Sequence, residues 1–349
     1  MTTDNACFAH PKTGELVLNP LRPLEQSLEK LPFQATELFE YQKIINENKV
    51  AVFHFNRGCP YPCTYCSAQK LAKQYGTVKE GLRQMPARRA IDAIKFTIEK
   101  YDVPSDTLLL FTDDLFTMFK DWLHEFLDLY EAEIARPFWS TARSNTASDE
   151  QFDRLKSAGC RTIMMAIESG NDFIRNKVMK RNISRKAMFN SFELASKYKL
   201  RTCSPCVIGV PFETPEMIDD SINTVAQLNI TEKGVNIFYP YRGTPLRDVC
   251  EANGFLPDGK VAVVERVGSM LNLPTITKEQ IQYYHDNWER LILKRMGMRS
   301  YFGSMCKDTY LALTDNPPGK KAKYFVDHNK HIRKFKEGCK KVLGISNLD

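Results

Sequence analysis

The chain has 349 residues, 43% of them hydrophobic and 26% charged, which is typical of a soluble globular protein with one large α/β domain and an appendage, or with two domains. No apolar run approaches the ~20 residues of a membrane span, and the N-terminus has neither a basic nor an apolar signal region, so we expect no membrane segment and a reducing, cytoplasmic setting. In that setting the ten cysteines indicate metal binding or incidental thiols, and they argue against a disulfide framework.

Residues 1–48 are predicted to form an extended lead-in with one short helix, because Pro20, Pro23 and Pro32 prevent long regular elements. From residue 49 to residue 255, short apolar runs alternate with longer amphipathic segments. The predicted strands are 50–56, 107–111, 138–141, 161–167, 202–208 and 234–239, and the predicted helices are 87–101, 118–133, 148–158, 172–180, 184–198 and 215–228.

Six strand-helix units in a row favour a parallel sheet with right-handed crossovers. Six units are too few to close an eight-stranded barrel, so we predict an α/β fold in which residues 49–255 form a partial (β/α)6 TIM-like barrel. The active-site loops of such a fold lie at the C-terminal ends of the strands.

Residues 256–349 are predicted to form a helical, basic C-terminal extension. Within it, residues 277–296 have helical periodicity and an apolar face typical of core packing, formed by Ile281, Tyr284, Trp288, Leu291 and Ile292. Residues 316–349 carry nine Lys or Arg against three Asp or Glu, so most of the net charge of +7 lies in this tail. Such a tail is more often a solvated helical face than a binding surface, and nucleic acid is therefore the less favoured partner.

Three cysteines, Cys59, Cys63 and Cys66, follow the first predicted strand in one loop with the spacing C-x3-C-x2-C. Thiolates this close in sequence indicate a metal centre, and three protein ligands leave one iron of a [4Fe–4S] cluster open. Structural zinc needs a fourth Cys or His nearby, but the next cysteine is Cys160 and His54 precedes the loop on the strand. The open cluster is the favoured interpretation, and zinc is the alternative.

With Tyr65 directly before the last cysteine, this loop resembles the cluster loop of the radical S-adenosylmethionine (radical SAM) superfamily. The resemblance implies a [4Fe–4S] cluster held by the three cysteines, with SAM chelating the open iron through its amino and carboxylate groups. It also implies that Tyr65 belongs to the cofactor-binding part of the loop.

Polar residues after later strands fit the same resemblance. Asp113 and Asp114 lie where the superfamily has a Gly-Gly-Glu motif, and their oxygens are candidates to accept hydrogen bonds from the SAM ammonium group, although an Asp that caps the next helix is equally consistent. Glu168 opens a Glu-Ser-Gly turn common in several subfamilies and is expected to bind the SAM ribose hydroxyls. Arg181, and less strongly Arg143, are candidates for the SAM carboxylate, which a guanidinium fork matches.

Residues 208–214 (IGVPFET) resemble the Ile-Gly-x-Pro-Gly-Glu-Thr motif of the superfamily's fifth strand, with a phenylalanine in place of the second glycine. Gly209 is expected to let the backbone approach the adenine, and Glu213 to fix the strand-to-helix turn. Residues 239–246 resemble the Pro-Gly-Thr-Pro-Leu turn of the methylthiotransferase and cobalamin-dependent branches. Cys203 and Cys206, three apart on a strand, point to opposite faces and are not expected to hold a second cluster.

The resemblance implies that an electron donor such as flavodoxin or ferredoxin reduces the cluster, that SAM is cleaved to methionine and a 5′-deoxyadenosyl radical, and that the radical abstracts a hydrogen atom from an unidentified substrate. No catalytic side chain beyond the cofactor contacts is identified. The likeness is strongest to the catalytic domain of the cobalamin-dependent enzymes, often methyltransferases, without their cobalamin-binding domain.

The six histidines contain no Asp-x-His-x-x-Gly cobalamin motif, so cobalamin, or a separate cobalamin-binding protein, stays an open assignment. The basic tail would suit a tRNA-modifying methylthiotransferase, which is the second enzyme candidate. From a different class, the alternative is a zinc-stabilised nucleic-acid-binding protein.

Overall fold

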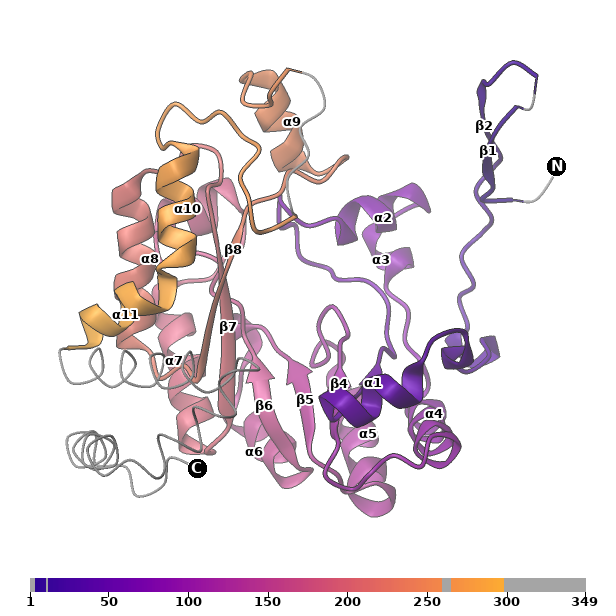
Figure 1. Ribbon diagram of the computed structural model, residues 1–349. Coiled ribbons are helices and arrows are strands. Elements are labelled where there is room, and N and C mark those ends of the chain that lie inside the picture. Colours follow the sequence, from indigo (N-terminus) through magenta and orange to yellow (C-terminus); the bar gives the residue numbers. More distant parts are fainter. Residues whose placement is uncertain (1–3, 11, 259–264, 298–349) are drawn as a thin grey trace, which may run out of the picture.

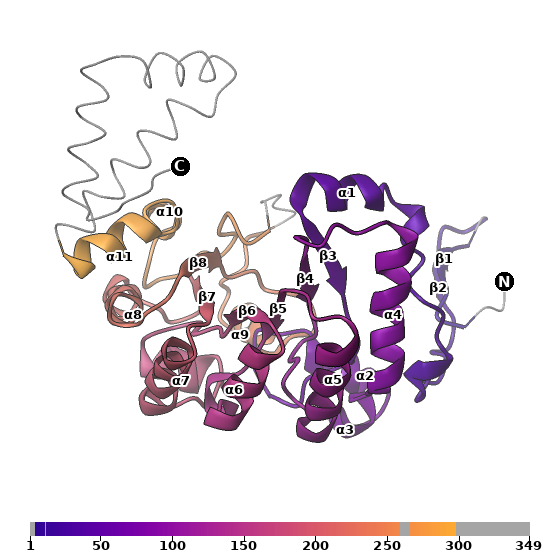
Figure 2. The ribbon, with the colours of Figure 1, turned by 90° about the horizontal axis from the view of Figure 1, so that it is seen from below.

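The computed structural model describes residues 4–10, 12–258 and 265–297, and its centre is a parallel six-stranded sheet in which the strands follow one another in chain order. The sheet curves into an open half-barrel (Figures 1 and 2), which confirms the predicted partial barrel. The strands are β3 (Val50–Phe53), β4 (Leu108–Phe111), β5 (Phe138–Thr141), β6 (Cys160–Met164), β7 (Arg201–Ile208) and β8 (Glu232–Ile237).

Helices cover the convex face of the sheet, as Figure 2 shows. They are α4 (Ala87–Lys100), α5 (Lys120–Glu133), α6 (Asp149–Ser157), α7 (Arg185–Lys197) and α8 (Pro215–Gln227), all close to their predicted bounds. Local chemistry explains several of their starts: the Ser148 and Ser184 hydroxyls accept the N–H groups of Gln151 and Ala187, and Pro215 stands in the first turn of α8, where its missing N–H costs nothing.

Aromatic packing fixes β4 against these helices. The ring centroid of Phe111 lies 5.0 to 6.3 Å from those of six other rings, belonging to Phe53, Phe55, Phe116, Phe126, Tyr130 and Phe138. Such pairs contribute about 0.5–1.5 kcal/mol each beyond their buried area. The end of β4, where Asp113 and Asp114 follow, is therefore a rigid support.

The predicted strand 50–56 is shorter and less buried than expected. β3 ends at Phe53, and its residues alternate, so that Ala51 and Phe53 are buried while Val52 is 37% exposed. The apolar run is continuous in sequence, but only one face of the half-barrel is covered by helices. The expected strand 161–167 likewise ends earlier, at Met164, although Met165 and Glu168 still donate backbone hydrogen bonds to the neighbouring strand β7.

The lead-in contains more structure than the one helix expected. β1 (Cys7–Ala9) and β2 (Leu16–Leu18) form a small antiparallel hairpin, and η1 (Leu28–Lys30), η2 (Thr36–Leu38) and α1 (Tyr41–Asn48) follow. The Tyr41 hydroxyl donates to the Val52 carbonyl at 3.3 Å and accepts the Val52 N–H at 2.9 Å. This contact covers the free edge of β3, which would otherwise be open to pairing with another strand.

The segment 277–296 is two helices and not the single predicted one. α10 (Lys278–Asp286) and α11 (Trp288–Met296) meet at Asn287, whose side-chain amide donates to the Tyr283 carbonyl at 2.9 Å. Such a side-chain bond competes with the backbone ladder and bends helices. The apolar face nevertheless packs as predicted, since Ile281, Trp288 and Ile292 are buried.

The basic tail 316–349 lies outside the described residues. Within the described part of the chain, no helix combines the length and apolarity needed to cross a bilayer.

Candidate active site

The cysteine loop leaves the C-terminal end of β3 and leads into two short helices, α2 (Ala68–Gln74) and α3 (Val78–Gly81). Cys63 is buried, Cys59 and Cys66 are half-buried, and all three thiols are free. Burial raises the pKa of the Cys59 and Cys66 thiols above the usual value. Positive charge near the loop is therefore needed to favour thiolates.

Asp113 holds the root of this loop. Its carboxylate accepts the Asn56 N–H at 2.6 Å and the Phe55 N–H at 3.3 Å, and the side chain is buried. Its carboxylate is thus already engaged with the main chain. Asp114, the next residue, is exposed and interacts electrostatically with Cys59 and Cys66. Of the two aspartates, Asp114 is therefore the one whose carboxylate is solvated and close to the cysteine loop.

Thr64 ties the middle of the loop to two helices that are distant in sequence. Its N–H donates to the Met179 carbonyl at 3.1 Å, its hydroxyl donates to the Val178 carbonyl at 2.7 Å, and its carbonyl accepts the Leu246 N–H at 3.0 Å. Val178 ends the π-helix η4 (Phe173–Val178), and Leu246 lies in the first turn of α9 (Pro245–Ala252). The loop is therefore fixed by contacts far away in sequence.

We expect Thr64→Val to lower the free energy of unfolding by about 1–2 kcal/mol, because it removes a buried donor and leaves the Val178 carbonyl without it. Urea titration measures the change. Thr64→Ser, which keeps the hydroxyl, is the matched control and should restore most of the loss. Equal losses for valine and serine would mean that methyl packing, and not the hydrogen bond, fixes the loop.

Two buried arginines converge on Cys63. Nη1 of Arg143 and Nη1 of Arg181 lie 4.0 and 3.9 Å from the Cys63 sulfur. The Arg143 guanidinium also stacks 3.7 Å over the Tyr61 ring, and its Nη2 donates to the Arg181 carbonyl. Both arginines were predicted as carboxylate ligands, and the structure brings them together at the central cysteine. The Arg143 charge lowers the pKa of the neighbouring Cys59 thiol and so opposes the larger rise that burial causes.

Glu168 lies beside the same cluster of charges. Its Oε1 accepts the Tyr65 hydroxyl at 2.8 Å and lies 3.9 Å from Nη1 of Arg181. Burial raises the pKa of Tyr65 well above its usual value, so the phenol keeps its proton and donates. Glu168 has a φ of +66°, which is uncommon for a residue with a side chain and is often found at functional sites.

Arg175 is a buried residue beside the candidate site that sequence reasoning did not single out. It is fully buried within η4, and its guanidinium donates to the carbonyls of Ile183, Ser169 and Gly170 at 2.9, 2.9 and 3.2 Å. It also pairs with Asp172. The predicted helix 172–180 is this π-helical turn. Its buried Arg175 side chain links the backbone next to Glu168 with the backbone next to Arg181. In the sequence Arg175 looks like any solvated helical arginine, so no local signal identified it.

The turn after β7 is built around Glu213, as predicted. Its Oε2 accepts the N–H groups of Gly209 and Val210 at 2.6 and 3.4 Å, and burial raises the pKa of this carboxyl to about 8. Gly209 has a φ of +74°, and a Cβ there would lie 3.0 Å from the Cδ1 atom of Ile281 in α10. The glycine therefore allows close approach of α10. Phe212 takes the glycine position of the motif with a φ of +68°.

We expect the stability of the protein to fall between about pH 5 and pH 8 because of Glu213. Its folded-state pKa of about 8 exceeds the ordinary 4.5, so the stabilisation is complete below pH 4.5 and is lost as the pH rises through 8. Glu213→Gln imitates the protonated form and should gain about 2 kcal/mol over the parent at pH 6 and more as the pH rises to 8. Urea unfolding at several pH values measures this, and exposed Glu216→Gln is the control. A parallel pH dependence of Glu213→Gln and the parent would contradict the assignment.

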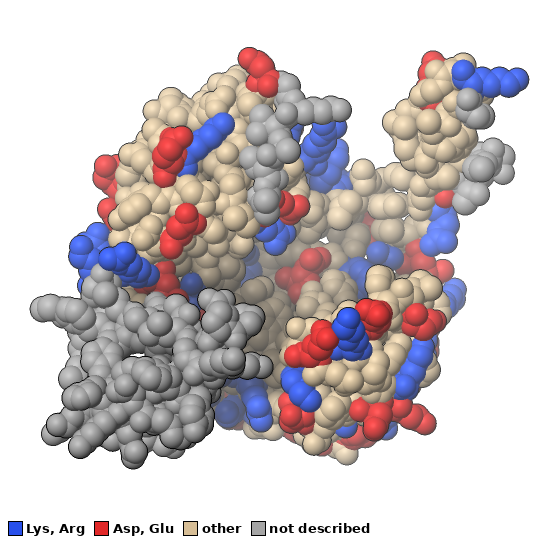
Figure 3. Space-filling view, viewed as in Figure 1, with Lys and Arg blue, Asp and Glu red and all other residues tan. Residues whose placement is uncertain are grey.

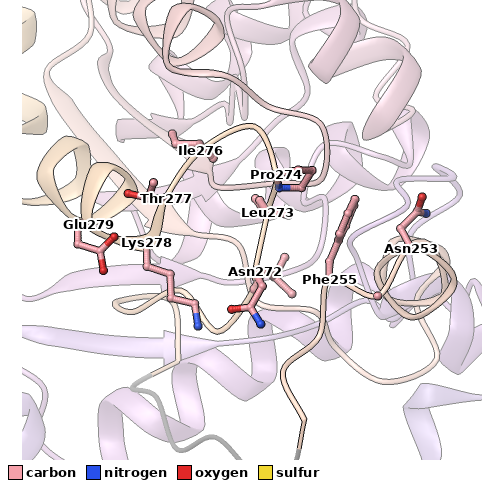
Figure 4. A pocket seen from close by; sticks show the side chains of 11 residues that line it. Asn253, Phe255, Asn272, Leu273, Pro274, Ile276, Thr277, Lys278 and Glu279 are labelled. Carbon is pink, nitrogen blue, oxygen red and sulfur yellow. The ribbon is translucent and has the colours of Figure 1, made fainter.

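Other features do not join this site. Cys203 is half-buried and Cys206 is buried, on opposite faces of β7 as the strand geometry predicted. The described residues contain no group of three or more His, Cys, Asp or Glu side chains arranged to hold a single metal ion. A pocket of ≈ 630 Å³ lies between the end of α9 and the start of α10 (Figure 4), and none of its lining residues belongs to the cysteine loop. Two of its polar side chains are already hydrogen-bonded to nearby backbone: the Asn253 amide donates to the Val249 carbonyl, and the Thr277 hydroxyl accepts the Gln280 N–H.

A family model described as "Radical SAM superfamily" matches residues 53–225. An uncharacterized methyltransferase of Pyrococcus horikoshii is 25% identical over 276 residues, which cover 78% of this chain and 58% of that protein. The anaerobic magnesium-protoporphyrin IX monomethyl ester cyclase of Rubrivivax gelatinosus is 21% identical over 221 residues, covering 62% of this chain and 38% of that protein.

Two solved structures share the fold. The cobalamin-dependent S-adenosylmethionine radical enzyme OxsB, with aqua-cobalamin bound, aligns with a TM-score of 0.62 at 14% identity, covering 95% of this chain and 52% of that one. The radical S-adenosylmethionine methyltransferase TsrM of Kitasatospora setae aligns with a TM-score of 0.54 at 16% identity, covering 71% of this chain and 49% of that one. The chain thus spans about half the length of these solved relatives.

Proposed function

We propose that this chain, which belongs to the radical SAM superfamily, holds a [4Fe–4S] cluster on Cys59, Cys63 and Cys66 and uses it to cleave S-adenosylmethionine reductively. The observation that carries the proposal is the convergence of Arg143 and Arg181 on the Cys63 sulfur at the mouth of the half-barrel. Two guanidinium groups offset the charge of three thiolates and remain available to a carboxylate.

Buried polar atoms at the mouth fit a bound polar cofactor. The Nε atoms of Arg143 and Arg181 and the hydroxyl of Ser144 are buried and have no hydrogen-bond partner among the described residues. Buried donors are rarely left unsatisfied in folded proteins, so their presence here supports a site that a ligand completes. A carboxylate is the natural acceptor for two guanidinium groups.

The roles of the other residues follow from their contacts. Glu168, aligned by the Tyr65 hydroxyl and by Arg181, is the proposed acceptor for the two ribose hydroxyls. Asp114, exposed beside the loop, is the proposed partner of the ammonium group. Asp113 and Glu213 position the backbone at two strand ends and are proposed to act only through it.

When bound and reduced by one electron, the cluster and SAM supply a 5′-deoxyadenosyl radical. The residues of this chain orient SAM and hold the carboxylate and diol in fixed positions. The proposed partner is an electron donor of the flavodoxin or ferredoxin type. Because the relatives with methyltransferase in their names align over most of this chain, we infer that methylation of an organic substrate is the modification.

Anaerobic reconstitution with iron and sulfide tests the proposal. We expect about four irons per chain, an EPR signal of the reduced protein that changes when SAM is added, and 5′-deoxyadenosine under dithionite. One zinc per chain with no SAM cleavage would overturn the proposal in favour of the zinc-stabilised nucleic-acid-binding protein.

Methylation has its own readout in the same preparation. Release of S-adenosylhomocysteine that requires added hydroxocobalamin would support methyl transfer and a cobalamin partner. Formation of 5′-deoxyadenosine with no S-adenosylhomocysteine, with or without cobalamin, would point to a modification that does not transfer methyl groups.

A further inference from the structure

The concave face of the sheet is lined mainly by apolar side chains. Residues alternate between the two faces of a strand, and the buried Ala51, Phe53, Leu109 and Phe111 belong to the convex, helix-covered face. Their neighbours therefore lie on the concave face, which we call the inner face. Its apolar members are Val50, Val52, Leu108, Leu110, Trp139, Met164, Cys203, Pro205 and Val207.

Register brings these side chains together across the strands. Val52 pairs with Leu110, and Leu110 pairs with Trp139. Met164 pairs with Cys203 on the next strands. Paired residues of parallel strands project from the same face, so Val52, Leu110 and Trp139 form one apolar group, and Met164 and Cys203 form a second. Between the two groups lie the buried Thr162, which pairs with Trp139, and the buried Thr141, which pairs with Met164. The five apolar residues are all partly exposed, which a residue of a closed barrel core would not be.

Within the strands themselves, the charged side chains of the inner face lie at the N-terminal ends. On the described inner face, Arg201 and Glu232 pair at 3.1 Å at the start of β7 and β8. The hydroxyl of Thr141 is already engaged with Asp113 and Phe116. No charged side chain lies between this lower rim and the mouth among the described inner-face residues of the six strands.

The inner face is continuous with the candidate active site. Ala166, two residues beyond β6, accepts a hydrogen bond from Nη2 of Arg181 at 2.7 Å, and Glu168 pairs with the end of β7 through a backbone bridge to Cys206. Asn236 on β8 pairs with Val207 on β7, and its side-chain amide lies at the end of the inner face nearest the mouth. Figure 3 looks into this hollow from the open side of the sheet.

On the premise of the proposed function, we propose that the substrate is a small organic molecule that lays an apolar ring or chain on the inner face, with its polar group toward the mouth. Trp139 provides an aromatic surface for a ring, and Leu110 and Met164 provide flexible aliphatic contact. Recognition of RNA rests instead on Lys and Arg contacts to phosphates, which this face does not offer. The substrate is thus distinguished from that of a tRNA-modifying enzyme.

Equilibrium dialysis with N-phenyl-1-naphthylamine, a neutral apolar ring compound, tests this inference on the reconstituted protein, because the free probe is measured away from the absorbing cluster. We expect saturable binding near one probe per chain. Leu110→Lys should weaken binding at least about tenfold, and Leu110→Met should retain it. Leu38→Lys, a substitution of an exposed leucine in the lead-in, is the matched control and should bind as the parent does.

The outcomes separate this inference from the proposed function. SAM cleavage by a parent protein that shows no saturable probe binding, or equal binding by Leu110→Lys and Leu38→Lys, would overturn the inference and leave the proposed function standing. Saturable binding of bulk tRNA at physiological salt in place of the probe would do the same, in favour of an RNA substrate. Failure to assemble a cluster or cleave SAM would overturn the proposed function itself. Thermal melting confirms that each variant is folded.

Discussion

Cys63→Ala is expected to abolish cluster assembly and SAM cleavage. Cys63 is the buried central thiol of the loop and the one that both Arg143 and Arg181 approach within 4.0 Å. Without it, only Cys59 and Cys66 remain, and two thiolates leave half of a four-iron cluster without protein ligands. Iron and sulfide content after reconstitution should fall to background, and no 5′-deoxyadenosine should form.

Cys7→Ala is the matched control, because Cys7 is an exposed free thiol in the lead-in hairpin. It should keep the full iron content and the full rate of SAM cleavage. A Cys63→Ala protein that still assembles four irons would show that another residue is the third ligand. A Cys63→Ala protein that loses bound zinc in place of iron would support the zinc alternative.

Arg175→Met is expected to destabilise the protein by about 3–5 kcal/mol and to weaken SAM binding by at least tenfold. The substitution leaves the buried carbonyls of Ser169 and Gly170 without the donor Arg175, while the Ile183 carbonyl keeps the Asn176 amide as a donor at 3.1 Å. Each unsatisfied buried acceptor costs about 1–3 kcal/mol. SAM affinity falls as well, because the Arg175 guanidinium connects the segment that carries Glu168 to the one that carries Arg181.

Urea unfolding measures the first effect and SAM binding by dialysis the second. Arg154→Met is the matched control, because Arg154 pairs with Asp128 and Glu131 at the surface, where such pairs contribute about 0–1 kcal/mol. It should leave SAM binding unchanged. A loss of stability in Arg175→Met without a change in SAM affinity would mean that Arg175 supports the fold only and does not position the site.

The two parts of the cofactor site differ in how far sequence could predict them. The cysteine loop could be found because its three cysteines are seven residues apart or fewer and follow an apolar run that predicts a strand. The arginines could only be proposed one at a time, since Arg143 and Arg181 lie on different strand ends and their common target, the Cys63 sulfur, appears only when the sheet curves.

Residues that act through the backbone were partly hidden. Glu213 was assigned correctly to its turn, because a motif of seven residues contains both the carboxylate and the N–H groups it accepts. Asp113 was expected to contact the ligand, and the structure engages its carboxylate with the backbone directly after β3, more than fifty residues earlier in the chain. The motif could not reveal that partner, since strand pairing and not sequence distance brings them together.

By itself, the sequence determined the alternation of strands and helices, the parallel half-barrel and the cysteine loop at its mouth, because hydrophobic periodicity and ligand spacing are local properties. Tertiary structure alone decided which charges meet at Cys63, that Arg175 is buried, that residues 277–296 break at Asn287, and that one face of the sheet is left partly exposed. These features depend on burial and on contacts between residues distant in the chain. The sequence alone does not distinguish a buried arginine from an exposed one, or an exposed valine from a buried one.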